Sequence, residues 1–166
     1  MTLKIYRILS FILIPPAILF SIMVLIFIAA AFANPAMLLP LFMIACIAIY
    51  TFTSFNFLMR GIDNGKKLPP SSRDWIKVNA IVSVIFCLLM LSSSFQINTE
   101  LKLLQDMFKE TRKQSDSIKI SEAEFAGYLK NMLIIFLVYS ALLLLHTILT
   151  FRLLKQYREI FTSDEQ

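Results

Sequence analysis

The sequence predicts an all-α integral membrane protein: a bundle of four transmembrane helices with a helical extracytoplasmic hairpin between the third and the fourth. Of its 166 residues, 58% are hydrophobic and 16% are charged, against ~45–50% apolar and ~25% charged in soluble domains. The apolar residues gather in four long runs without a charge, whereas the strands of a membrane barrel are ~10 residues of alternating polarity. We expect residues 1–166 to form a single membrane domain.

The four apolar runs are each long enough to form a membrane span. They cover residues 8–33, 36–59, 78–97 and 132–151, and the shortest runs have 20 residues. An α-helix needs ~20 apolar residues to cross the ~30 Å hydrocarbon layer. The pattern therefore predicts four spans, an outer segment at 98–131 and a tail at 152–166.

The first run has two further features, a resemblance to a signal peptide and a pair of prolines. Lys4 and Arg7 followed by an apolar stretch and a small-x-small sequence at 31–33 resemble a cleaved signal peptide. The run is much longer than the 7–15 apolar residues of such a leader, so we expect it to remain as a span. Pro15 and Pro16 remove two backbone donors and predict a packing kink, with a movable hinge as the alternative.

The connections carry their own signals. Asn34 fits a helix N-cap and Pro35 the first helical position, so the first two spans are predicted to form a tight hairpin. The second connection, residues 60–77, contains the glycines, prolines and serines of a loop. Trp75, just before the third span, is expected to anchor at the membrane interface.

The distribution of basic residues predicts the orientation. Ten lie in the N-terminus, the second connection and the tail: Lys4, Arg7, Arg60, Lys66, Lys67, Arg73, Lys77, Arg152, Lys155 and Arg158. Six lie in residues 98–131. The positive-inside rule therefore predicts a cell-membrane protein with both termini in the cytoplasm. The sequence contains no basic run with interleaved aromatic residues, so nucleic acid is not expected as a partner. Membrane lipids are expected partners, including anionic headgroups near the second connection.

The outer segment is predicted to be mostly helical. Residues 99–114 read as an amphipathic helix, and residues 115–120 as its end. Ser121 and Glu124 form a capping box that starts a helix leading into the fourth span. This segment either packs as a hairpin on itself and the headgroups, or offers a docking surface to an extracytoplasmic partner.

Polar residues inside the spans are predicted to form a layer in the cytoplasmic half of the bundle, because such residues normally face inward. The candidates are Thr53 and Asn56, Asn79 and Ser83, and His146 and Thr150. Asn56 is four residues from Arg60, or roughly 6 Å in depth at 1.5 Å per residue. The layer is expected to be structural; the alternative is a small hydrated pocket that binds a proton, an ion or a polar ligand, with His146 as the titrating group.

No signature predicts catalysis, a cofactor or a metal site. Cys46 and Cys87 lie in separate apolar runs, His146 is the single histidine, and every Asp and Glu lies outside the four runs. Disulfide oxidants, four-helix haem proteins, membrane aspartyl peptidases and proton-coupled exporters each need residues that are missing here. We therefore expect no enzyme, but a scaffold, regulatory or accessory subunit that binds a membrane-protein partner or a copy of itself. The alternative is a small transporter or channel subunit that uses the polar layer and the proline kink, and an enzyme with an unfamiliar site ranks third.

Overall fold

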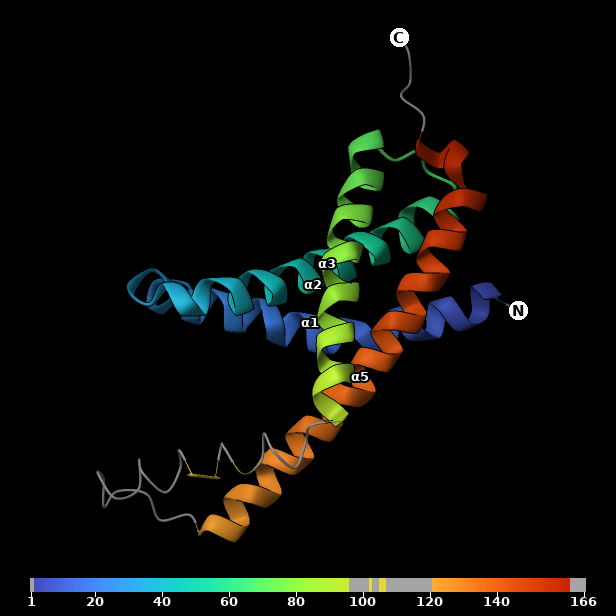
Figure 1. Cartoon of the computed structure of the whole chain (residues 1–166). Coiled ribbons are helices and arrows are strands. Elements are labelled where there is room, and N and C mark those ends of the chain that lie inside the picture. Colours follow the sequence, from blue (N-terminus) through green and yellow to red (C-terminus); the bar gives the residue numbers. More distant parts are fainter. Residues whose placement is uncertain (1, 96–101, 103–104, 107–120, 162–166) are drawn as a thin grey trace. The chain divides into compact units, whose positions relative to one another are not determined.

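In a computed structural model of the protein, residues 2–95, 102, 105–106 and 121–161 are described, and they contain helices and no strand. Four long helices dominate this part of the chain (Figure 1). They are α1 (Thr2–Ala33), α2 (Leu38–Asn56), α3 (Pro70–Phe95) and α5 (Glu122–Gln156). Each lies in a helical segment that is long and apolar enough to cross a membrane. The expected all-helical chain with four long apolar helices is confirmed.

Three of the helices begin before the apolar runs that predicted them, whereas α2 lies within its run. α1 already begins at Thr2, α3 begins at Pro70, and α5 covers Glu122–Gln156. A change from apolar to polar side chains does not interrupt backbone hydrogen bonding, and long basic side chains can direct their charges away from an apolar surface. The helices α1, α3 and α5 therefore begin one or more turns before the predicted spans.

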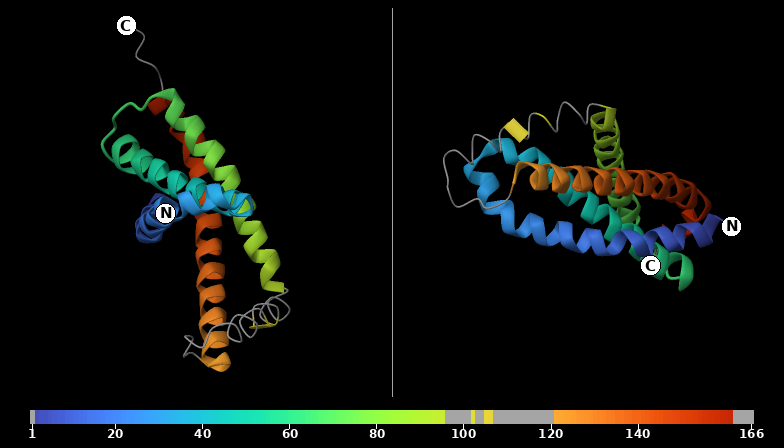
Figure 2. Two further views of the ribbon diagram at one scale, coloured as in Figure 1. Left: turned by 90° about the vertical axis from the view of Figure 1, so that its left-hand side faces the viewer. Right: turned by 90° about the horizontal axis from the view of Figure 1, so that it is seen from below.

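Residue contacts divide the chain into two compact units, residues 1–86 with 142–166, and residues 87–141. In the first unit, α1 and α2 run side by side in opposite directions (Figures 1 and 2). Their connection holds the short helix η1 (Pro35–Met37), and the Asn34 side chain accepts a hydrogen bond from the Ala36 N–H at 3.2 Å. The predicted cap and tight hairpin are confirmed.

α2 continues directly into a π-helical segment, η2 (Phe57–Asp63), which is followed by the loop to α3. The wider turn of a π-helix changes the angular register of the residues that follow. Gly61 lies inside this segment, and a Cβ there would meet the side chains of Leu68 and Ile160 at 3.2 and 3.3 Å. The missing side chain allows this close approach.

The C-terminal end of the first unit folds back onto η2. The Leu68 N–H donates to the Ile160 carbonyl at 2.8 Å. Phe161, in the short helix η3 (Arg158–Phe161), lies against Phe57 with ring centroids 5.3 Å apart. These contacts join the second connection to the tail.

The second unit contains the end of α3 and the first half of α5. The Ser121 N–H donates to the Glu124 carboxylate at 2.9 Å, and the Glu124 N–H donates back to the Ser121 hydroxyl at 3.3 Å. The predicted capping box is confirmed. Of the expected outer helix at 99–114, only residues 102 and 105–106 are described, and they are helical; the expected break at 115–120 lies outside the described residues.

Candidate functional site

A cluster of hydroxyl and ring side chains is buried where α1, α2 and the second half of α5 meet, within the first unit. Each helix contributes two residues spaced i, i+4, which places both on one face. They are Tyr6 and Ser10 from α1, Tyr50 and Ser54 from α2, and His146 and Thr150 from α5. All six are at most 1% exposed, so their polar atoms must find partners inside the protein.

His146 lies at the centre of this cluster. Its Nε2 is 2.9 Å from the Ser10 hydroxyl, and its Nδ1 is 2.8 Å from the Tyr50 hydroxyl. The Tyr6 ring stacks on the imidazole with centroids 4.6 Å apart and planes at 13°, while the Tyr50 ring meets it edge-on. The imidazole therefore contacts both α1 and α2 through polar atoms and ring faces.

The hydrogen bonds continue beyond the ring. The Tyr50 hydroxyl lies 2.8 Å from the Thr150 hydroxyl, which also lies 3.4 Å from the Tyr6 hydroxyl. The Tyr6 hydroxyl in turn donates to the Ser54 carbonyl at 3.3 Å. These contacts connect α1 to α2, α1 to α5 and α2 to α5, and we call the six residues the His146 network.

The protons of the network can be placed without a charge. A neutral imidazole has one N–H donor and one acceptor nitrogen, whereas a hydroxyl both donates and accepts. If Nε2–H donates to Ser10, the Ser10 hydroxyl is free to donate to the Tyr6 carbonyl at 2.9 Å, and Tyr50 donates to Nδ1. The buried ring is thereby satisfied by neutral partners, which offsets its desolvation.

The predicted polar layer divides into two groups in the structure. His146 and Thr150 belong to the network. Asn79 and Ser83 are also buried, but their side chains donate to carbonyls of their own helix, at Trp75 and Asn79, each at 2.8 Å. Short polar side chains commonly make such bonds within a helix.

The two candidates from α2 lie outside the network. Thr53 is half-buried and donates to the Ile49 carbonyl one turn earlier at 2.7 Å. Asn56 is half-buried at the last position of α2. The α2 residues of the network are Tyr50, which contacts His146, and Ser54, whose carbonyl accepts a hydrogen bond from Tyr6.

Four network members were not among the predicted candidates. Tyr6 precedes the first apolar run, Ser10 is a single polar residue inside that run, and Tyr50 and Ser54 lie in the second run next to Thr51 and Thr53. The signal that could have found them is the repeated i, i+4 pairing of a hydroxyl with a ring, or of two hydroxyls, on α1, α2 and α5. That signal alone does not say which faces meet.

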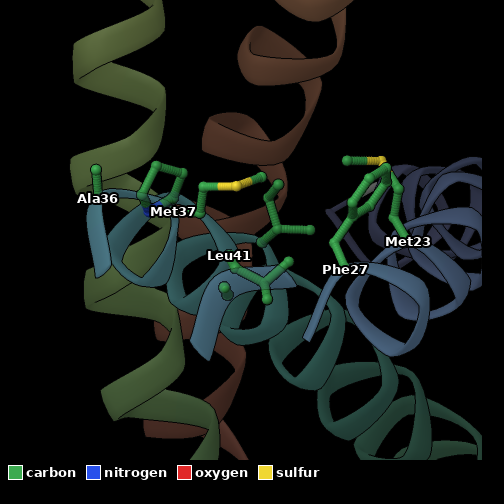
Figure 3. Close-up of a pocket in the computed structure, with 8 residues that line it drawn as sticks. Met23, Phe27, Ala36, Met37 and Leu41 are labelled. Atoms are coloured by element: carbon green, nitrogen blue, oxygen red, sulfur yellow. The ribbon is translucent and has the colours of Figure 1, made fainter. Parts of the chain in front are cut away.

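An apolar hollow lies between α1 and α2 near their connecting turn (Figure 3). It has a volume of about 300 Å³, and Met23 and Phe27 face it from α1 while Met37 and Leu41 face it from the other side. Its lining side chains are all apolar. It therefore offers hydrophobic contact and no side-chain hydrogen bonds to an occupant.

Within the described ranges, no group of three or more His, Cys, Asp or Glu side chains is arranged to hold a metal ion. Comparison with models of protein families, with curated proteins and with solved structures finds no match to this chain. The chemistry of the network itself is limited: it joins one imidazole to hydroxyl and carbonyl groups, and its six members include no carboxylate, lysine or arginine.

Proposed function

We propose that this chain is a multi-pass protein of the cell membrane, and that it serves there as a non-catalytic scaffold, regulatory or accessory subunit. Its exposed surface supports the membrane assignment. In the apolar window of α1, 11% of the residues are buried within the protein, and Leu19, Leu25 and Phe32 are 65–75% exposed. An apolar surface of this extent is typical of contact with lipid or with other membrane helices.

The contacts at one end of the first unit support the proposed topology. The Arg7 guanidinium donates to the Asp63 carboxylate at 2.6 Å, which joins the N-terminus to the second connection. The Leu68–Ile160 hydrogen bond joins the same connection to the tail. Segments in contact lie on the same side of the membrane, so each contact requires an even number of spans between the two segments that it joins. With the excess of basic residues there, we assign this end to the cytoplasm and residues 98–131, including the helical hairpin, to the outside.

The observation that carries the non-catalytic role is the closed hydrogen bonding of the His146 network. Both ring nitrogens of His146 already have hydroxyl partners, from Ser10 and Tyr50. A group that binds a substrate or relays ions needs polar atoms directed into a cavity, whereas these atoms are directed at one another across three helices. Such a network stabilises one arrangement of the helices, which suits a subunit that presents a defined surface to a partner.

The topology is tested by lysine labelling in sealed vesicles of the full chain. Lys66 is expected to react from the cytoplasmic face, and Lys102 and Lys130 from the other. Labelling of Lys66 and Lys130 from one face would overturn the four-span assignment.

The role is tested by purification of the chain in mild detergent, followed by mass spectrometry of what remains bound. A membrane protein at fixed stoichiometry, or a defined oligomer of the chain itself, is the expected result. The transporter alternative predicts instead that the chain purifies alone and, in proteoliposomes, conducts protons or ions. A flux that is lost in His146→Ala but retained in Thr53→Ala, a control outside the network, would replace the scaffold proposal with transport.

A further inference from the structure

The contacts at the end of the first unit gather four chain segments that are distant in sequence. The Arg7–Asp63 ion pair holds the start of α1 against the end of η2. The Leu68–Ile160 hydrogen bond holds the following loop against η3, and α3 begins two residues later at Pro70. We call this end of the unit the basic end, because it carries the ten basic residues of the N-terminus, the second connection and the tail.

The basic end has a large excess of positive charge. In its described part, ten basic residues stand against three acids, Asp63, Asp74 and Glu159. Asp63 is already paired with Arg7. Lys4, Lys66 and Arg158 are among the basic side chains that are exposed. Gathered charges of one sign create a local potential that attracts multivalent or densely packed anions.

The apolar surface beside the basic end identifies the anion. On α3, Trp75 and Val78 are 57% and 60% exposed, and on α1, Ile5 and Ile8 are 41% and 60% exposed. The exposed charges therefore border directly on side chains that suit hydrocarbon. A phospholipid places an anionic phosphate directly beside acyl chains, which matches exposed basic side chains that border on an exposed apolar surface.

We propose that the basic end binds the headgroups of anionic phospholipids and enriches them around the protein over zwitterionic lipids. Lysine and arginine stems lie along the apolar surface and place their charges at the level of the phosphates. Removal of one such charge is expected to lower the local preference for an anionic lipid by up to about fivefold. The preference should weaken as salt rises, because exposed charges are screened.

The single tryptophan of the chain provides the measurement. Trp75 is exposed at the basic end, and bromine atoms on acyl chains quench tryptophan fluorescence on contact. The full chain is reconstituted in mixtures of phosphatidylglycerol and phosphatidylcholine in which either lipid is brominated. Brominated phosphatidylglycerol is expected to quench Trp75 more strongly at equal mole fraction.

Two double variants locate the preference. Lys66→Gln with Arg158→Gln removes two exposed charges of the basic end and is expected to reduce the preference several-fold. Lys102→Gln with Lys130→Gln removes the same amount of charge away from the basic end, at position 102 and on α5, and is expected to leave the preference unchanged. Equal quenching by the two lipids in the unmodified chain, or an equal effect of both double variants, would overturn the proposal.

Competition with soluble anions distinguishes a lipid headgroup from a soluble anion or an acidic partner as the ligand of the basic end. Inorganic phosphate, or a soluble polyglutamate, at matched ionic strength should leave the quenching preference unchanged; loss of the preference would assign the basic end to a soluble anion or an acidic partner instead. The inference rests on the proposed membrane insertion, and the same measurement separates the two. Quenching by either brominated lipid supports insertion, and absence of quenching by both contradicts insertion itself.

Discussion

Replacement of His146 by alanine tests whether the buried network holds the three helices together. The substitution removes the hydrogen bonds to Ser10 at 2.9 Å and to Tyr50 at 2.8 Å. It also removes the ring that stacks on Tyr6. Two buried hydroxyls then lose a partner, and a space remains where the imidazole was.

The expected loss follows from these contacts. An interhelical hydrogen bond in a membrane contributes about 0.6 kcal/mol on average and up to about 1.7. A stacked ring pair contributes about 0.5–1.5 kcal/mol, and the space left by the ring adds a further loss of packing. We expect His146→Ala to lower the free energy of unfolding by about 2–4 kcal/mol.

The assay is reversible unfolding in mixed micelles, with helicity followed as the denaturing detergent is increased. A matched pair on α5 serves as the control. Thr150 and Thr147 are both at most 1% exposed. The Thr150 hydroxyl contacts the Tyr50 hydroxyl of another helix, whereas the Thr147 hydroxyl donates to the Leu143 carbonyl of its own helix. Thr150→Val is expected to destabilise by about 1 kcal/mol and Thr147→Val by less than about 0.5.

A double-mutant cycle isolates the central pair. His146→Ala and Tyr50→Phe should be non-additive by at least about 0.5 kcal/mol, since both remove the same hydrogen bond. If His146→Ala lies within about 0.5 kcal/mol of the unmodified chain, or if the two threonine variants behave alike, the network does not hold the helices together and the reasoning is refuted.

Three further predictions concern the ends of the helices. Gly61→Leu should lower the free energy of unfolding by about 1–3 kcal/mol, because the new side chain has no room next to Leu68 and Ile160. Gly127→Leu, in open space, should change the free energy of unfolding by less than about 0.5 kcal/mol. Asp63→Asn removes an exposed ion pair and should change the unfolding free energy by less than about 1 kcal/mol; a larger loss would show that this pair is essential to the end of the unit. Hydrogen bonds from Ser121 lower the pKa of the Glu124 carboxyl, which lies ahead of the apolar run, so the cap stabilises above the usual carboxyl pKa and loses that contribution as pH falls through the lowered value. Protection of the first turn of α5 against hydrogen exchange, taken relative to the intrinsic rate at the same pH, should fall at low pH and in Ser121→Ala, and unchanged protection in that variant would contradict the cap.

Several local features could be predicted from neighbouring residues alone. The cap at Asn34 and the capping box at Ser121 and Glu124 depend on side chains that reach only two or three positions along the chain. The packing kink expected at Pro15 and Pro16 stays a prediction; α1 is one helix over Thr2–Ala33 with both prolines inside it. The π-helical segment at 57–63 was not predicted. Gly61 in this segment packs closely against Leu68, which lies beyond the helix end, and against Ile160, which is distant in sequence.

The sequence by itself determined that the chain forms four long apolar helices, because a run of about 20 uncharged apolar residues satisfies its backbone within the helix whatever lies around it. It also placed His146 and Thr150 on one face of α5. Only the tertiary structure decided that this face meets Tyr6 and Ser10 of α1 and Tyr50 of α2. Helices that are apolar on all sides carry no periodicity to say which face points inward, so their rotation is chosen by the hydrogen bonds and close contacts that become possible when the helices pack.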